Sequence, residues 1–133
     1  MTAVVVDTDV VSMIFKGHSL ADKYLDIIEG HSVVLSFMTL AELTLWAERR
    51  SWGAERRKRL SQFLTNFKIC HSDESLCETW ASIRHKAFAG GQPIEVADAW
   101  IAATAVYLDV SLVTHNRKHF DHVQQLRLVP VVG

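Results

Sequence analysis

The acidic residues of this chain stand where they could hold a metal ion. Asp7 and Asp9 directly follow a short apolar run, and Glu42 stands in the segment TLAEL. Glu95 and Asp98 are three residues apart and therefore share one face of a helix. Carboxylates gathered in one place repel one another unless a cation lies among them. Hard oxygen ligands of this kind suit Mg²⁺ or Mn²⁺.

Each acid also has a structural explanation when it is taken singly. Glu42 stands three residues after Thr39, which is the capping-box spacing, and Asp98 would lie near a helix N-terminus, where the helix dipole favours a negative charge. Taken together, the acids favour a metal-binding site over separate structural roles. Asp7 follows a run of valines and Asp98 is embedded in VADAWIAATAV. A carboxylate in apolar surroundings is costly unless it is paired or metal-bound.

The apolar pattern predicts the elements that position these acids. Apolar strands are expected at residues 3–6, 32–37, 69–70, 110–114 and 128–132, with Pro130 indicating an edge position for the last. Helices are expected over 19–29, from Thr39 to about 51, over 54–67, from Asp73 to 89 and over 94–108, with a helical turn or loop over 115–122. Strands alternating with helices predict an α/β fold whose mostly parallel sheet is covered on both faces. The site of such a fold lies beyond the carboxyl ends of the strands.

Length and composition limit the class of protein. The 133 residues are 49% hydrophobic with a net charge of −1, which fits a single domain over residues 1–133 and excludes disorder as the main state. No apolar run is long enough to span a membrane, and the N-terminal residues do not resemble a signal peptide. Cys70 and Cys77 cannot form a disulfide framework, so a reduced, cytoplasmic protein is expected.

One segment is strongly basic although the whole chain is not. Residues 49–59, RRSWGAERRKR, hold six basic residues and one acid. Arg56, Arg57 and Arg59 are candidates for RNA binding, because Lys and Arg side chains that neutralise phosphates supply the sequence-independent part of nucleic-acid affinity. A solvated helix face explains the same charges. Trp52, beside the break at Gly53, is a candidate for contact with RNA or a partner.

Four segments carry a resemblance to a known family. VVVDTDVV, TLAEL, GGQPIEVADAWIAATAV and LVTHNRKHF occur in an order and at spacings that resemble PIN-domain ribonucleases, and most of all the VapC-type toxins of bacterial toxin–antitoxin pairs. The resemblance covers nearly the whole chain. It implies a PIN-like three-layer α/β/α sandwich with a mostly parallel sheet, and a Mg²⁺- or Mn²⁺-dependent endoribonuclease.

The resemblance also implies roles for individual residues. Asp7, Glu42 and Asp98 match the family's catalytic acids and would hold the metal, and Asn116 matches the asparagine of its T-x-N segment. The ions would lower the pKa of the attacking water and stabilise charge on the phosphoryl oxygens. The residues implied as supporting ones are Thr8, Asp9, Glu95, Thr114 and Asp121.

This chain departs from the family pattern at two positions. Asp9 is acidic where the family often has Asn, Ser or Cys. His119 stands where the family's fourth acid commonly falls, three residues after Asn116, and Asp121 two residues further on is a possible substitute.

The resemblance further implies partners. These are an RNA substrate, a second copy of the chain in a homodimer, and a VapB-type antitoxin whose basic side chain could pair with Asp7 or Asp98. DNA would be contacted only through the antitoxin, and no membrane is involved. Helix faces that one small core would leave uncovered suit such partners, and the residues expected there are Ile14, Phe15, Leu43, Trp46 and Trp52.

Other classes of function share some of these features. A haloacid-dehalogenase-like phosphatase also has Asp-x-Asp after its first strand, as at Asp7 and Asp9, but it needs a lysine and a further Asp pair after later strands. A catalytically inactive PIN-like interaction protein is the second alternative. Zinc held by His115, His119 and His122 is less favoured, because structural zinc sites usually include Cys and neither Cys is near in sequence.

Overall fold

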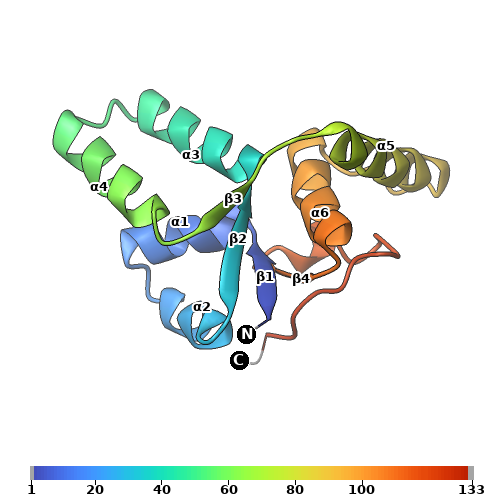
Figure 1. Ribbon diagram of the computed structural model, residues 1–133, viewed down its shortest axis with the longest axis horizontal. Coiled ribbons are helices and arrows are strands. Elements are labelled where there is room, and N and C mark those ends of the chain that lie inside the picture. The colour runs from blue at the N-terminus through green and yellow to red at the C-terminus, as the bar shows by residue number, and fades with distance from the viewer. Residues whose placement is uncertain (1, 132–133) are drawn as a thin grey trace.

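The computed structural model describes residues 2–131, which form a parallel sheet with helices on both of its faces (Figure 1). The four strands lie in the order β3-β2-β1-β4 and are β1 (Ala3–Val6), β2 (Ser32–Ser36), β3 (Lys68–Cys70) and β4 (Ser111–Val113). The helices are α1 (Thr8–Lys16), α2 (Ala21–Ile28), α3 (Phe37–Arg49), α4 (Ala54–Leu64), α5 (Glu74–Ala89) and α6 (Val96–Leu108), followed by the 3₁₀ turn η1 (Arg117–His119).

Alternate side chains of each strand enter two separate cores. Val4 and Val6 of β1 pack with α1 to α4, whereas Val5 packs with α5 and α6. In β4, Val113 packs with α1 to α4 and Leu112 packs with α5 and α6. Helices α1 to α4 accordingly lie on one side of the sheet and α5 and α6 on the other (Figure 1). Strands that are buried on both faces must be apolar throughout, and the expected three-layer α/β/α fold is confirmed.

The order of the strands creates a crevice beside β1. The chain proceeds outward from β1 to β2 and β3, and then returns to place β4 on the other side of β1. At such a reversal the connections leave in opposite directions and leave a crevice at the carboxyl ends of the strands. Val6 pairs with Val113 at the end of the two strands, so Asp7 and Thr114 emerge next to each other.

The start of α3 differs from the prediction. Ser36 caps the helix by accepting a hydrogen bond from the Met38 N–H at 3.0 Å, so the predicted capping box of Thr39 and Glu42 is wrong. Thr39 is instead buried, and its hydroxyl lies 2.9 Å from that of Thr8. Ser and Thr both cap helices, and here the tertiary contact of Thr39 decides between them.

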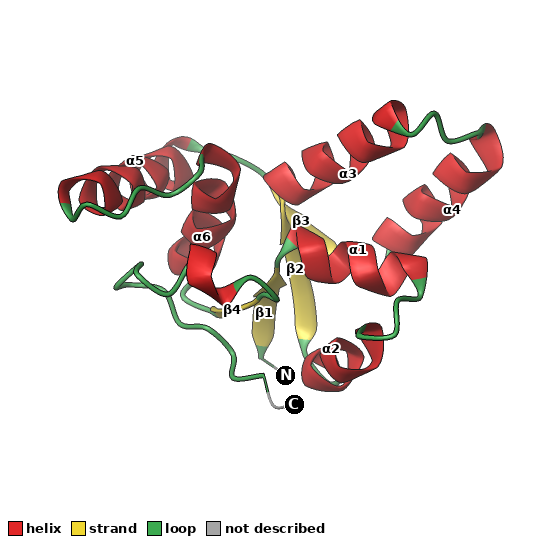
Figure 2. Cartoon of the chain, turned by 180° about the vertical axis from the view of Figure 1, so that it is seen from behind, coloured by secondary structure: helices red, strands yellow, loops and turns green. Residues whose placement is uncertain are grey.

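The prediction at the C-terminal end is also only partly right. Leu128 makes a single parallel bridge to Leu112, and residues 129–131 continue without a strand. Pro130 has no N–H to donate to a ladder, which explains the early end of the pairing. The predicted end of this strand, Val132, lies outside the described residues. Most of the chain after β4 is loop (Figure 2).

In residues 2–131, no helix has the length and apolar character needed to cross a membrane. Both cysteines are free thiols, with Cys70 partly buried and Cys77 exposed.

Candidate active site

An open cavity of about 290 Å³ lies at the carboxyl ends of the strands. The turn after β1, the helices α1, α3 and α6, and the segment after β4 all contribute to its wall. Four of the side chains in this wall are carboxylates, and none of the described residues in it is Lys or Arg. The lining residues are Asp7, Thr8, Asp9, Ser12, Glu42, Leu43, Trp46, Asp98, Asn116 and His119.

Asp7 is the most deeply buried of the four acids, with 5% of its surface exposed. It caps α1, where its Oδ1 accepts a hydrogen bond from the Thr8 N–H at 2.8 Å. Its Oδ2 accepts one from the Thr114 hydroxyl at 2.7 Å. Burial raises the pKa of Asp7 well above its ordinary value and the negative charge of Asp9 raises it further, against the effect of the Thr114 hydrogen bond.

Glu42 reaches the same cavity from the second turn of α3. Its Oε1 accepts a hydrogen bond of 2.7 Å from the Thr8 hydroxyl, which ties α3 to the start of α1. Partial burial raises the pKa of Glu42, and the charges of Asp98 and Asp9 add to the effect. The Thr8 hydroxyl opposes this rise because it stabilises the ionised form.

Asp98 enters from the first turn of α6. Its Oδ2 lies 3.2 Å from Nδ1 of His119. Burial raises the pKa of Asp98, while His119 lowers it and the charges of Glu95 and Asp9 raise it again. Glu95 itself is exposed at the N-terminus of α6 and does not line the cavity.

The segment Thr114–Asn116 holds two of the acids in place. The Asn116 side chain donates a hydrogen bond from Nδ2 to Oδ2 of Asp9 at 2.9 Å. The Asn116 N–H lies 3.1 Å from the Thr114 hydroxyl oxygen, which accepts from it while donating to Asp7. One short segment after β4 therefore orients the carboxylates of both Asp7 and Asp9.

The structure places Asp121 apart from the other predicted site residues. Its exposed carboxylate lies 3.8 Å from Nδ1 of His122 and does not line the cavity. The cavity instead contains Ser12, Leu43, Trp46 and His119, none of which was predicted as a site residue. Helical spacing gives a signal for two of them, because Ser12 follows Asp9 by three residues and Trp46 follows Glu42 by four.

The donor set of the cavity fits a hard divalent cation. Four carboxylates line one space, and Asp7, Glu42 and Asp98 each have a pKa raised in part by the charge of a neighbouring acid. In the part of the chain that the structure describes, no three His, Cys, Asp or Glu side chains are already gathered closely enough to hold one ion. A cation would therefore have to draw these carboxylates together.

The three C-terminal histidines do not form a zinc site. His115 is hydrogen-bonded to the Tyr24 hydroxyl, His119 faces Asp98, and His122 lines a different cavity. No His-rich cluster occurs among residues 2–131, so the zinc alternative receives no support.

The basic segment is engaged in packing as well as exposed to solvent. Arg57 donates to the carbonyl oxygens of Trp52 and Ala47 at 2.8 and 3.3 Å and forms an ion pair with Glu48 at 3.0 Å. Arg56 lies over the Trp52 ring at 4.1 Å. The Arg59 side chain is exposed and has no ion pair among the described residues.

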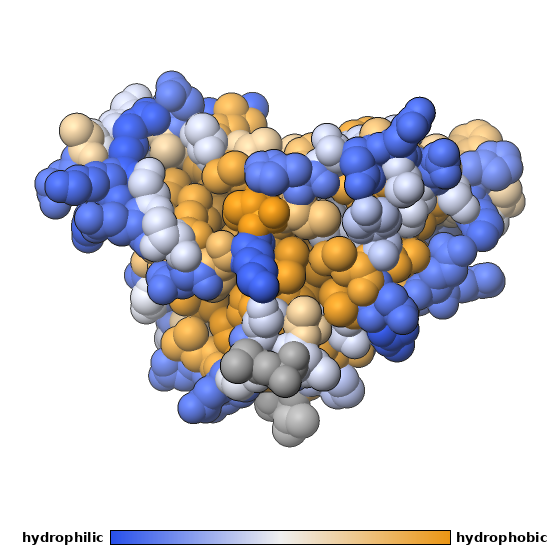
Figure 3. Space-filling view, viewed as in Figure 1, coloured by the Kyte–Doolittle hydropathy of each residue, from blue (hydrophilic) through white to orange (hydrophobic). Residues whose placement is uncertain are grey.

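Two of the aromatic and apolar residues expected at the surface are in the core. Trp52 is only 7% exposed and packs against Phe15 and Trp46, so the expectation that it contacts RNA or a partner is wrong. Leu43 is 1% exposed. The face drawn in Figure 3 shows a broad hydrophobic area across its middle, framed by hydrophilic residues. The large apolar side chains that are exposed are Leu20, Leu25, Leu45, Phe88, Val96 and Tyr107.

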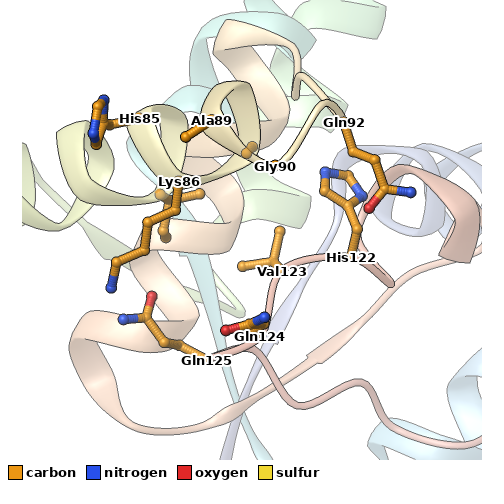
Figure 4. Close-up of a pocket in the computed structure, with 11 residues that line it drawn as sticks. His85, Lys86, Ala89, Gly90, Gln92, His122, Val123, Gln124 and Gln125 are labelled. Atoms are coloured by element: carbon orange, nitrogen blue, oxygen red, sulfur yellow. The ribbon is translucent and has the colours of Figure 1, made fainter.

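A second cavity, of about 490 Å³, lies between the C-terminal half of α5 and residues 122–125 (Figure 4). The Lys86 side chain extends toward Gln125, and His122 lies beside Gln92 (Figure 4). No lining residue described for this cavity is an acid. It therefore lacks the carboxylate donors of the cavity around Asp7, which remains the candidate active site.

The model of one protein family, the PIN domain, matches residues 4–126. The chain belongs to the PIN-domain family. Ribonuclease VapC1 of Haemophilus influenzae is 28% identical to this PIN-domain chain over 124 residues, covering 91% of it and 92% of the relative. Ribonuclease VapC4 of Mycobacterium tuberculosis is 31% identical over 96 residues, covering 71% and 74%. Among solved structures, VapBC2 from Rickettsia felis bound to a DNA fragment from its promoter has a TM-score of 0.86 at 20% identity, covering 98% of this chain and 100% of that one.

Proposed function

We propose that this PIN-domain protein is a metal-dependent endoribonuclease and the toxin component of a type II toxin–antitoxin pair. The observation that carries the proposal is the convergence of Asp7, Asp9, Glu42 and Asp98 on one cavity at the reversal point of the sheet. The curated relatives at 28% and 31% identity are named ribonucleases, which supports the same activity.

The side chains of Asp7, Glu42 and Asp98 would hold Mg²⁺ or Mn²⁺. When bound, such ions stabilise negative charge on phosphoryl oxygens and lower the pKa of a water that attacks phosphorus. The protein contributes orientation, since Thr114 fixes Asp7 and Thr8 fixes Glu42 through hydrogen bonds of 2.7 Å. Hydrogen-bonded partners of this kind typically strengthen metal binding and activity.

The rim of the cavity suits a nucleic-acid backbone. Trp46 lines the cavity, the Nζ of Lys16 lies 4.2 Å from the centre of its ring, and the guanidinium of Arg50 lies 5.1 Å from it. A strand entering the cavity would therefore meet two cations beside an aromatic ring, which is a common combination in proteins that bind single-stranded nucleic acids.

The two alternative functions find less support. A haloacid-dehalogenase-like phosphatase needs a lysine in its site, and none of the described residues of this cavity is a lysine. An inactive PIN-like protein has no need to gather four acids at a cost in stability, and three of these acids have raised pKa values.

The partners belong to the same proposal. Structural neighbours include VapBC from Salmonella typhimurium and FitAcB from Neisseria gonorrhoeae, at TM-scores of 0.80 and 0.79. VapBC-5 from Mycobacterium tuberculosis, another neighbour, is a member of the VapBC family of toxin-antitoxin systems. We propose that this chain is likewise inhibited by a VapB-type antitoxin and that it forms a homodimer. A basic side chain of the antitoxin would pair with Asp7 or Asp98 and compete with the metal. DNA would be bound by the antitoxin.

Incubation with total RNA in Mg²⁺, Mn²⁺ or EDTA, followed by sequencing of the fragment ends, tests this function. We expect internal cleavage at defined sites with either metal and none with EDTA. A small phosphate monoester serves as the second substrate. Release of phosphate from it without cleavage of RNA would indicate the phosphatase, and the absence of both activities would indicate the inactive protein.

A further inference from the structure

His119 brings a nitrogen ligand into a cavity otherwise built from oxygen donors. It ends the turn η1, and the next residue, Phe120, is 1% exposed and anchors the turn in the core. The His119 N–H donates to the Asn116 carbonyl oxygen at 3.0 Å, which fixes the backbone of this turn beside the cavity. The fold thus sets the backbone position of His119, and its side chain is half exposed.

The His119 side chain faces the carboxylates of the cavity and pairs with one of them. Its Nδ1 lies 3.2 Å from Oδ2 of Asp98, and the same cavity holds Asp7, Asp9 and Glu42. Adjacent ligands of an octahedral ion with bonds of about 2.1 Å lie about 3.0 Å apart. The separation of Nδ1 and Oδ2 is therefore close to that of two neighbouring ligands of one ion.

We propose that His119 is a direct metal ligand of this site and that it shifts the preference of the site from Mg²⁺ toward Mn²⁺. This inference rests on the proposed function, because it concerns the same metal. Mg²⁺ binds almost entirely through oxygen, whereas imidazole nitrogen suits transition-metal ions, and Mn²⁺ accepts both kinds of ligand. A set of carboxylates with one imidazole therefore selects Mn²⁺ over Mg²⁺ more strongly than carboxylates alone.

The test is the binding of Mn²⁺ and Mg²⁺ to the metal-free protein without RNA, by titration calorimetry, together with pulsed EPR of bound Mn²⁺. The EPR experiment detects a nitrogen bound directly to the ion. The wild-type protein is expected to give this nitrogen signal, and His119→Gln to lose it. His119→Gln should weaken Mn²⁺ about tenfold or more and Mg²⁺ about threefold or less.

Two further variants sharpen the result. His119→Asp restores an all-oxygen site and should raise Mg²⁺ affinity relative to Mn²⁺. His115→Gln makes the same substitution at a histidine that does not line the cavity, and should keep both the nitrogen signal and the wild-type affinities. Thermal melting of each variant verifies that it is folded.

Mn²⁺ bound without a nitrogen signal, or bound equally well by His119→Gln, overturns the inference. If RNA cleavage still requires a metal in that case, the proposed function stands without it. If the wild-type protein binds neither ion and cleaves RNA in EDTA, both the inference and the metal dependence fail.

Discussion

At the scale of single residues, the buried carboxylate of Asp7 costs the metal-free protein stability. Its pKa is raised in the folded protein, which means that the fold favours the protonated form of this side chain. Asp7 therefore stabilises the fold below its unfolded-state pKa of about 3.9, and this stabilisation is lost as pH rises through the folded-state pKa. The partly buried Glu42 and Asp98 act in the same direction. A site that must bind a cation is thus least stable at the pH where it is charged and empty.

Asp7→Asn should therefore stabilise the metal-free protein at neutral pH by about 1 kcal/mol or more, because it removes a buried negative charge. The gain should shrink as pH falls toward 4. Urea unfolding in EDTA across this pH range measures it, with the exposed Asp26→Asn as the control that gains nothing. This explanation would be refuted if Asp7→Asn were less stable than the wild type at neutral pH and the difference in stability did not change with pH.

Asp98→Asn should abolish RNA cleavage while the protein remains folded, because it removes a ligand charge and keeps the shape of the side chain. We expect a loss of at least about a hundredfold in rate. Glu95→Gln is the matched control, since Glu95 is exposed outside the cavity, and it should retain most of the activity. Cleavage rates measure the activity of both variants, and circular dichroism verifies that they are folded. A folded Asp98→Asn protein with full activity would show that Asp98 is not a catalytic residue.

At the scale of elements, the basic helix α4 combines two roles that single substitutions can separate. Arg57 is hydrogen-bonded to the Trp52 carbonyl, so Arg57→Gln should lower the free energy of unfolding by about 1–2 kcal/mol. Arg59→Gln should leave stability unchanged, weaken RNA binding and reduce its salt dependence, because Arg59 is exposed. Thermal melts and salt-dependent RNA binding of both variants test this division. Unchanged binding by Arg59→Gln would leave α4 as a solvated helix.

Strands and helices were predictable from sequence where periodicity and burial agree. The valines of β1 and β2 and the apolar stripe of α5 placed these elements within a few residues. No bounds were predicted for α1, because its cap, Asp7, also belongs to the acidic motif. The start of α3 was misplaced because a distant contact between Thr8 and Thr39 outweighs the local capping pattern.

The acids of the candidate site were predictable, whereas the contact that His119 makes with one of them was not, although the resemblance places His119 at the position of the family's fourth acid. Asp7 follows a strand, and Glu42 and Asp98 lie in the first two turns of helices within recognisable motifs, so their convergence follows from a parallel sheet. The contact between His119 and Asp98 joins residues 21 positions apart on a turn that periodicity does not define. The burial of Trp52 was equally hidden, because it depends on packing between helices α1, α3 and α4.

At the scale of the whole molecule, the apolar surface left uncovered predicts a homodimer in solution. Phe88 is 76% and Val96 50% exposed, and a broad hydrophobic area crosses one face (Figure 3). Light scattering at micromolar concentration should give twice the chain mass of 15.0 kDa. Val96→Glu should shift the protein toward the monomer, because it places a charge on the exposed apolar surface. A wild-type monomer would contradict the prediction.

Removal and restoration of the metal tests the central claim most directly. The wild-type protein is stripped with EDTA, dialysed, and incubated with one RNA that contains a mapped cleavage site, and the cleavage rate is measured as Mn²⁺ is added back. If the protein is a metal-dependent endoribonuclease, we expect no cleavage by the stripped protein. Addition of Mn²⁺ should restore cleavage of the same phosphodiester in a saturable way, and should not restore it in Asp98→Asn. Cleavage at the wild-type rate in the stripped protein, or a return of cleavage in Asp98→Asn equal to that of the wild type, would contradict the account.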